Sequence, residues 1–155
     1  GAALTAPADT IIRRPVPAVG TACFRGDDVL LIRRGTKPLA GDWSIPGGRL
    51  EFGERTADGA LRELHEETGI TARLVGLVDV VDAIFTSRQS GETHRHFVLF
   101  DYAAIWEAGD PVAGDDADHA EWISPDRLDS LGLWSETLRI ITAARTLVQA
   151  DSRIA

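Results

Sequence analysis

The sequence has a single cysteine among its 155 residues. Cys23 therefore cannot form a disulfide within the chain, and a zinc site built from cysteines is excluded as well. No apolar run approaches the ~20 residues that a membrane-spanning helix needs, and residues 1–15 lack the basic-then-apolar pattern of a signal peptide. We therefore expect a cytoplasmic protein without a membrane partner.

Positive charge is scarce and dispersed. The 16 basic residues are outnumbered by 24 acidic ones, so the formal net charge is −8. No basic cluster is longer than the pairs Arg13-Arg14 and Arg33-Arg34. Such a chain should repel the phosphates of duplex nucleic acid, which excludes it as an expected partner. If the ligand carries phosphates, metal cations are the natural way for an acidic protein to hold it.

The order of the expected elements indicates a single α/β domain. Hydrophobic residues make up 44% of the chain, which is typical of a globular protein. Residues 1–15 are expected to form a loose N-terminal arm and residues 16–150 the domain. Helical patterns cover 56–68 and 135–149, and apolar patterns predict strands at 16–24, 29–33, 43–45, 72–83, 93–106 and 119–123.

Three glutamates of the expected helix 56–68 share one side of it. At 100° per residue, Glu66 lies about 60° to one side of Glu63, and Glu67 lies about 40° to the other. Three like charges this close repel one another, and a divalent cation would turn the repulsion into coordination. Mg²⁺ prefers carboxylates, water and phosphate oxygens. The alternative is an ordinary solvated helix face, on which each carboxylate is exposed.

The residues around this helix complete a longer motif. Gly48 is followed after five residues by Glu54, and after seven more by the run from Arg62 to Ile70, RELHEETGI. This is a complete match to the Nudix box, and the chain resembles the Nudix hydrolase family, in particular its small MutT-like and ADP-ribose-pyrophosphatase-like bacterial members. The resemblance implies a Nudix-type α/β/α sandwich with a central mixed β-sheet.

The resemblance also implies a metal site. Its ligands to Mg²⁺, or alternatively Mn²⁺, would be the carboxylates of Glu63, Glu66 and Glu67 and the backbone carbonyl of Gly48. Either Glu63 or Glu66 would take the proton of the attacking water. Some family members use an acid on a later loop, and its spacing points to Asp116 here.

Other residues are expected to support the box or the substrate. By resemblance, Glu54 and Arg62 form an ion pair that braces the loop against the helix. Four arginines could donate forked hydrogen bonds to phosphate, and these are Arg33, Arg34, Arg49 and Arg95. Gly59 lies within the helix, where it costs about 1 kcal/mol relative to alanine; it could leave room for a loop or for the substrate, or be a weak helix residue that the helix tolerates.

The resemblance implies a Mg²⁺-dependent pyrophosphohydrolase that cleaves the diphosphate of a nucleoside diphosphate linked to another group, X. We favour a nucleotide sugar such as ADP-ribose as this small-molecule substrate. The alternatives are a MutT-like triphosphate pyrophosphatase acting on, for example, 8-oxo-dGTP, a Nudix-fold binding module without turnover, and a related fold with another reaction. The apolar strands 72–83 and 97–106 could supply a homodimer interface.

Overall fold

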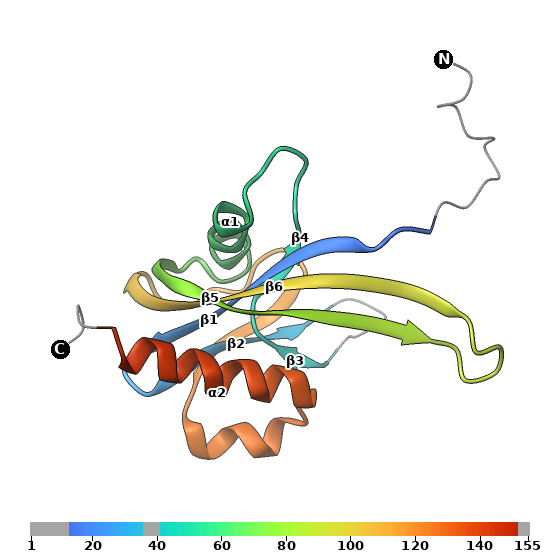
Figure 1. The fold of residues 1–155 in the computed structure, drawn as a ribbon. Coiled ribbons are helices and arrows are strands. Elements are labelled where there is room, and N and C mark those ends of the chain that lie inside the picture. The colour runs from blue at the N-terminus through green and yellow to red at the C-terminus, as the bar shows by residue number, and fades with distance from the viewer. Residues whose placement is uncertain (1–12, 36–40, 152–155) are drawn as a thin grey trace.

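A computed structural model describes residues 13–35 and 41–151 (Figure 1). In chain order its elements are β1 (Val16–Arg25), β2 (Asp28–Arg34), β3 (Trp43–Ser44), β4 (Gly47–Arg49), α1 (Thr56–Thr68), β5 (Thr71–Thr86), β6 (Thr93–Ala108), β7 (Ala117–Ile123), a 3₁₀ helix (Pro125–Leu131) and α2 (Ser135–Gln149). Each expected strand and helix is present, and β5 and β6 extend further than the sequence pattern indicates.

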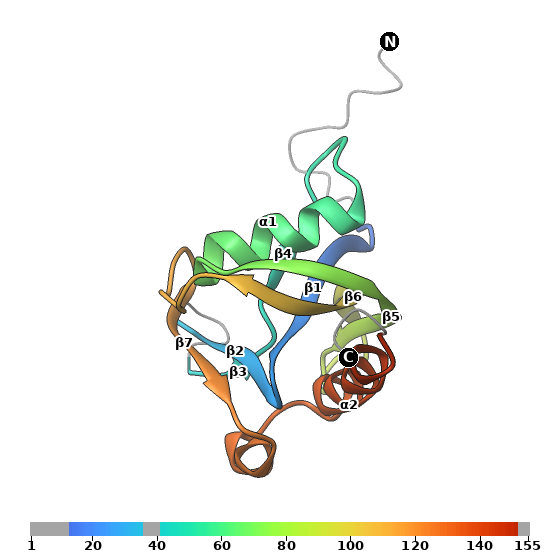
Figure 2. The same ribbon diagram turned by 90° about the vertical axis from the view of Figure 1, so that its left-hand side faces the viewer.

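The strands form one mixed sheet. Its main order is β3-β2-β1-β6-β5, while β4 pairs with β1 and β7 pairs with β2. The central β1 and β6 run parallel, and the other pairs are antiparallel. The two long helices α1 and α2 lie on opposite sides of β1, β5 and β6 (Figures 1 and 2). The expected α/β/α sandwich with a central mixed sheet is confirmed.

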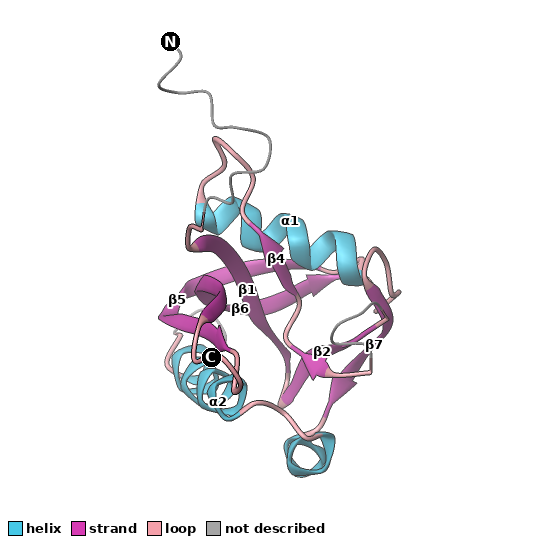
Figure 3. Ribbon diagram, turned by 90° about the vertical axis from the view of Figure 1, so that its right-hand side faces the viewer, coloured by secondary structure: helices cyan, strands magenta, loops and turns pink. Residues whose placement is uncertain are grey.

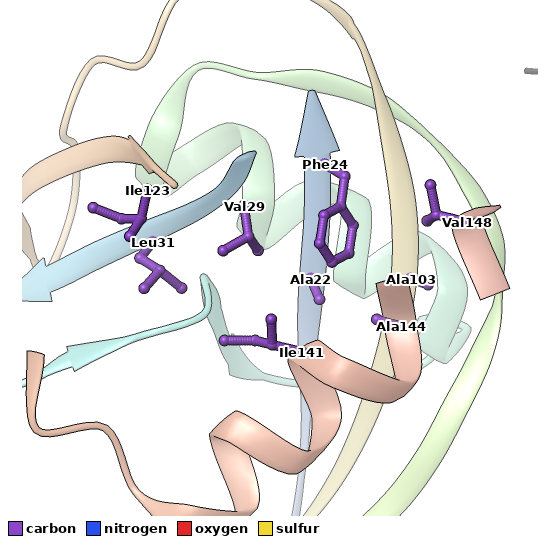
Figure 4. Packing of buried hydrophobic residues seen from close by; sticks show 9 residues of the cluster. All are labelled: Ala22, Phe24, Val29, Leu31, Ala103, Ile123, Ile141, Ala144 and Val148. Carbon is purple, nitrogen blue, oxygen red and sulfur yellow. The ribbon is translucent and has the colours of Figure 1, made fainter. Parts of the chain in front are cut away.

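One core cluster joins the sheet to α2. Inward-facing residues of β1, β2 and β6 meet the apolar side of α2 (Figure 4). Its buried members are Ala22, Phe24, Val29, Leu31, Ala103, Ile123, Ile141, Ala144 and Val148. Because burying one large aliphatic side chain is worth roughly 1.5–3 kcal/mol, this cluster fixes the position of α2.

The short strand β4 is absent from the sequence prediction. Its residues are Gly47, Gly48 and Arg49, which have no strand propensity of their own. Antiparallel pairing with β1 sets Gly48 beside Val19 and Arg49 beside Ala18. A tertiary contact therefore makes this strand, and it brings the start of the box against the middle of the sheet (Figure 3).

Strands β5 and β6 form a long ribbon that projects from the body of the molecule (Figure 1). Its exposed apolar side chains include Leu77, Val80, Ile84 and Phe85. The homodimer expected through this region stays a prediction. Of the arm, residues 1–12 lie outside the described residues. Among the residues that are described, no helix is both long and apolar enough to cross a membrane.

Candidate active site

Two glycines bring the strand β4 into close contact with its neighbours. A Cβ atom on Gly47 would collide with the carbonyl oxygen of Val19, and one on Gly48 would lie 2.6 Å from the carboxyl carbon of Glu63. Side chains at these positions would therefore push β4 away from β1 and from α1. Glycine allows this close approach of backbone to carboxylate.

Arg62 connects the loop before α1 to the helix. Its Nε and Nη2 atoms donate to the two carboxylate oxygens of Glu54 at 2.6 and 2.9 Å. Its Nη1 atom donates to Glu63 at 2.8 Å and to Glu66 at 3.1 Å, and it lies 3.6 Å from Glu51. One guanidinium thus contacts four carboxylates. Hydrogen bonding to Arg62 lowers the pKa of Glu54 to about 2.

Gly59 provides the space that this pair occupies. A Cβ atom there would lie 2.7 Å from Oε1 of Glu54 and 3.0 Å from Cδ1 of Leu50. The glycine is buried within α1, so its cost to the helix is offset by the room it leaves for the loop. Of the roles expected for Gly59, these distances support room for the loop before α1.

The carboxylate of Glu67 is buried, with 2% of its residue surface exposed. The expectation that it lies on the surface is wrong, because strand β4 covers it: the Gly47 N–H donates to its Oε1 atom at 2.7 Å. Burial, assisted by the charges of Glu63 and Asp116 and opposed by the Gly47 bond and the charge of Arg34, raises the pKa of Glu67 to about 8.

The loop before β7 adds two more acids to this region. The Val112 N–H donates to the Thr68 carbonyl at 2.8 Å, and the Gly114 N–H donates to the Glu67 carbonyl at 3.0 Å. These bonds satisfy carbonyls at the end of α1 that have no partner within the helix. They also hold the following Asp115 and Asp116 near the box.

The charges of these two aspartates act on different glutamates. Burial raises the pKa of Glu63, Arg62 opposes this, and the negative charges of Glu66 and Asp115 raise it further. Asp116, the residue that the sequence analysis singled out, acts on Glu67 instead. The spacing that selects Asp116 does not select Asp115, since an acidic loop by itself carries no signal of which carboxylate faces the site.

The donor set fits a divalent cation. Carboxylate oxygens are the ligands that Mg²⁺ prefers, and the crowding of Glu63, Glu66, Glu67 and the two aspartates leaves negative charge that a cation would neutralise. Among the described residues, no three acidic, histidine or cysteine side chains converge closely enough to ligate one ion. Instead Glu63 and Glu66 contact Arg62, and Glu67 contacts Gly47.

The four arginines expected at the substrate separate into two pairs. Arg33 donates to Asp118 at 2.9 Å, and Arg34 has a buried Nε atom with no hydrogen-bond partner among the described residues. The charge of Arg34 lowers the pKa of Glu67, which places it near the box. Arg49 and Arg95 instead line a separate cleft beside β4.

The candidate site thus consists of an acidic helix packed against a glycine-rich strand of a mixed sheet, and comparison with known proteins identifies its family. The sequence model of the NUDIX domain matches residues 14–144. The chain therefore belongs to the Nudix hydrolase family, an enzyme family that generally uses divalent metal ions. This match confirms the expected enzyme class, a Nudix pyrophosphohydrolase.

Individual relatives differ in their substrates. An ADP-ribose pyrophosphatase of Methanocaldococcus jannaschii is 29% identical over 80% of this chain and 70% of its own length. An 8-oxo-dGTP diphosphatase of Escherichia coli is 31% identical over 69% of this chain and 78% of its own length. Among solved structures, a MutT NUDIX hydrolase of Burkholderia pseudomallei is 29% identical, with a TM-score of 0.70 over 84% of this chain and 98% of its own.

Proposed function

We propose that the protein hydrolyses the diphosphate of a nucleoside diphosphate linked to another group, X, in a reaction that depends on Mg²⁺. The observation that carries this proposal is the buried Glu67, held beside Glu63 against the glycines of β4. Burying a carboxylate among other carboxylates is costly unless a cation compensates it. A cation bound during the reaction would offset this free-energy cost.

We assign the metal to the carboxylates of Glu63, Glu66 and Glu67, to Asp116, and to the Gly48 carbonyl, with Mn²⁺ as an alternative to Mg²⁺. When bound, the metal neutralises developing charge on the diphosphate and makes water a stronger nucleophile. The ion pair of Arg62 with Glu54 holds the loop and the helix at a fixed distance. Its role is to position the glutamates and not to contact the substrate.

The protein must also accept a proton from the attacking water. Two carboxylates are candidates for this general base, Glu63 and Glu66. Each lies within the box, and Glu63 is the more buried of the two. Water then attacks phosphorus in line, and the other phosphate leaves with the remainder of X. The products are a nucleoside monophosphate and phosphorylated X.

ADP-ribose is the first substrate to test. The relative from M. jannaschii, which matches the larger share of this chain, carries that activity in its name. A triphosphate such as 8-oxo-dGTP is the second candidate, since the E. coli relative is named for it. The intact set of box acids argues against a binding module without turnover, because such a module has no need of the general base.

A panel assay tests the proposal. The protein is incubated with Mg²⁺ and ADP-ribose, other nucleotide sugars, dinucleoside polyphosphates, NADH or 8-oxo-dGTP, and each product is identified by mass. One substrate should reach a kcat/KM of about 10⁴ M⁻¹s⁻¹ or more, in the ordinary enzyme range. Release of a nucleoside monophosphate that stops with EDTA supports hydrolysis. Stoichiometric binding without any product would instead indicate a binding module.

A further inference from the structure

A basic cleft lies beside the box, where the chain segment before β1 meets the start of β6. It has a volume of about 480 Å³. Its basic side chains come from three separate parts of the sequence and are Arg13, Arg14, Arg49, His94, Arg95 and His96. None of the described residues that line this basic cleft is acidic. Positive charge is thus gathered at one place in a chain whose net charge is −8.

The sheet pairing explains how distant arginines meet there. Ala18 of β1 lies beside Leu99 of β6 in parallel register and beside Arg49 of β4 in antiparallel register. Alternate residues of a strand share a face of the sheet. Arg95 therefore lies on the same face as Leu99, and Arg49 lies on that face too. The same pairing places the preceding residues 13–16 along the start of β6.

These guanidinium groups are not used in ion pairs. Across residues 13–35 and 41–151, none of the salt bridges involves Arg13, Arg14, Arg49 or Arg95. Arg13 donates instead to the backbone carbonyl of Thr93 at 2.9 Å, which fixes the incoming segment to β6. Arg62, in contrast, contacts four carboxylates. The cleft therefore keeps its positive charge for a ligand.

The donor chemistry of the cleft fits phosphate better than a sugar. Arginine presents a planar fork of N–H donors that matches phosphate oxygens and accepts no hydrogen bond. An uncharged sugar has hydroxyl groups that also need acceptors, and no carboxylate or amide side chain lines this cleft in the described residues. Four arginines thus indicate a ligand with negative charge of its own.

The basic cleft adjoins the box through Arg49. Arg49 directly follows Gly48, where a Cβ atom would collide with the Glu63 carboxylate, and the Arg49 carbonyl accepts a hydrogen bond from Arg62 at 3.2 Å. We propose that the basic cleft binds a phosphate group of the substrate that lies outside the scissile diphosphate. This inference rests on the proposed function and narrows it: X ends in a phosphate, as in a nucleoside triphosphate or a nucleotide sugar carrying a phosphomonoester.

Direct binding tests the cleft without any turnover. Inorganic tripolyphosphate is titrated into metal-free protein by calorimetry, using the wild type and the double variant Arg14→Gln/Arg95→Gln. Affinity should fall at least tenfold in that variant. The matched control Arg25→Gln/Arg127→Gln removes two charges outside the cleft and should bind as the wild type does. No binding by the wild type, or an equal loss in the control, would overturn the proposal.

Kinetic measurements then distinguish a nucleoside triphosphate from a phosphorylated nucleotide sugar as the source of the phosphate. Matched pairs are compared: ADP-ribose with ADP-ribose 1″-phosphate, in which the added phosphate is on the terminal ribose, and dGDP with dGTP. For the preferred pair, the compound with the extra phosphate should have the lower KM, and the Arg14→Gln/Arg95→Gln variant should raise that KM at least tenfold with little change in kcat. Its partner without the extra phosphate should be affected less than threefold. Equal effects on both members of each pair would overturn the proposal.

The two proposals fail in different ways. If tripolyphosphate binds in the cleft but no nucleotide is hydrolysed, the proposed function fails and the anion site stands. If ADP-ribose is hydrolysed with a KM that neither an added phosphate nor the cleft variant changes, the proposed function stands and the cleft inference fails.

Discussion

The two long helices are similar in length but bury different kinds of side chain. The buried residues of α2 are all apolar, namely Ile140, Ile141, Ala144 and Val148. In contrast, α1 buries a glycine and a glutamate alongside its apolar residues, Gly59 and Glu67 among them. Because apolar burial stabilises and burial of a charge destabilises, α2 contributes stability to the fold. The buried glutamate and glycine of helix α1 lower the stability of the fold, and they hold the carboxylates in fixed positions.

The largest effect is expected where α1 buries charge. Glu67→Gln should lower turnover by about 100-fold or more, because it removes a proposed metal ligand. The glutamine can still accept the bond from the Gly47 N–H, so metal-free protein should become more stable by about 1–3 kcal/mol near neutral pH. Steady-state kinetics at saturating Mg²⁺ and urea unfolding in EDTA measure the two effects.

The pH dependence of this stabilisation has a definite sign. The pKa of Glu67 is about 8 in the folded state, above its unfolded value, so the folded protein loses stability as pH rises toward and through 8. The gain from Glu67→Gln should therefore grow with pH. Glu66→Gln is the matched control: it removes an exposed carboxylate, and it should lower turnover without raising stability. Wild-type turnover in both variants would exclude both residues from the metal site.

Removing an apolar side chain from α2 should lower stability and leave turnover unchanged, the opposite of the effects expected for Glu67→Gln. Ile141 is 1% exposed and contacts the core cluster, so Ile141→Ala should destabilise the protein by about 2–5 kcal/mol. Well below its lowered Tm, kcat should stay close to that of the wild type. Urea unfolding and initial rates at a low temperature check this. A loss of kcat in fully folded protein would mean that α2 also positions the site.

A buried charge also lies on the α2 side of the sheet, at Asp101. It is 5% exposed, and burial, assisted by the charge of Asp79 and opposed by that of Arg139, raises its pKa to about 6. Since this value is above the unfolded one, Asp101 contributes stability at low pH that is lost as pH rises through 6. Asp101→Asn should therefore stabilise the protein above pH 6, by about 1–3 kcal/mol.

Two observations would test that assignment. The stability difference between Asp101→Asn and the wild type should disappear only at pH ~2.5, where the carboxyl is neutral in both the folded and the unfolded state. In Asp79→Asn, the NMR titration of the Asp101 carboxyl should move to lower pH. A difference independent of pH would show that the substitution acts through packing and not through charge.

The smallest effect is expected from exchanging alanine and glycine within the two helices. Ala143→Gly on α2 should cost about 1 kcal/mol, as helix propensity predicts. Gly59→Ala on α1 should fail to return that amount, because its Cβ atom would meet Oε1 of Glu54 at 2.7 Å, an atom held by Arg62. Thermal unfolding of both variants measures the difference. A gain of the full propensity value in Gly59→Ala would mean that Glu54 moves freely.

Much of the site could be predicted from sequence because its interactions are local. Arg62 meets Glu66 one helical turn later, and the periodicity of an α-helix fixes that meeting. The pair of Arg62 with Glu54 spans only eight residues. The same reasoning failed for Glu67: helical periodicity gives the direction of its side chain, but its exposure depends on strand β4, which the sequence pattern does not predict.

The sequence by itself determined the spacing of the acids, the order of the strands and helices, and the family, because propensity and motif spacing depend on near neighbours. The tertiary structure alone decided that Glu67 is buried, that Asp115 joins Asp116 beside the box, and that Arg13 meets Arg95 across 82 positions of the chain. These outcomes depend on the parallel pairing of β1 with β6 and on β4 docking. Such long-range contacts form only when the whole sheet assembles, and no local pattern encodes them.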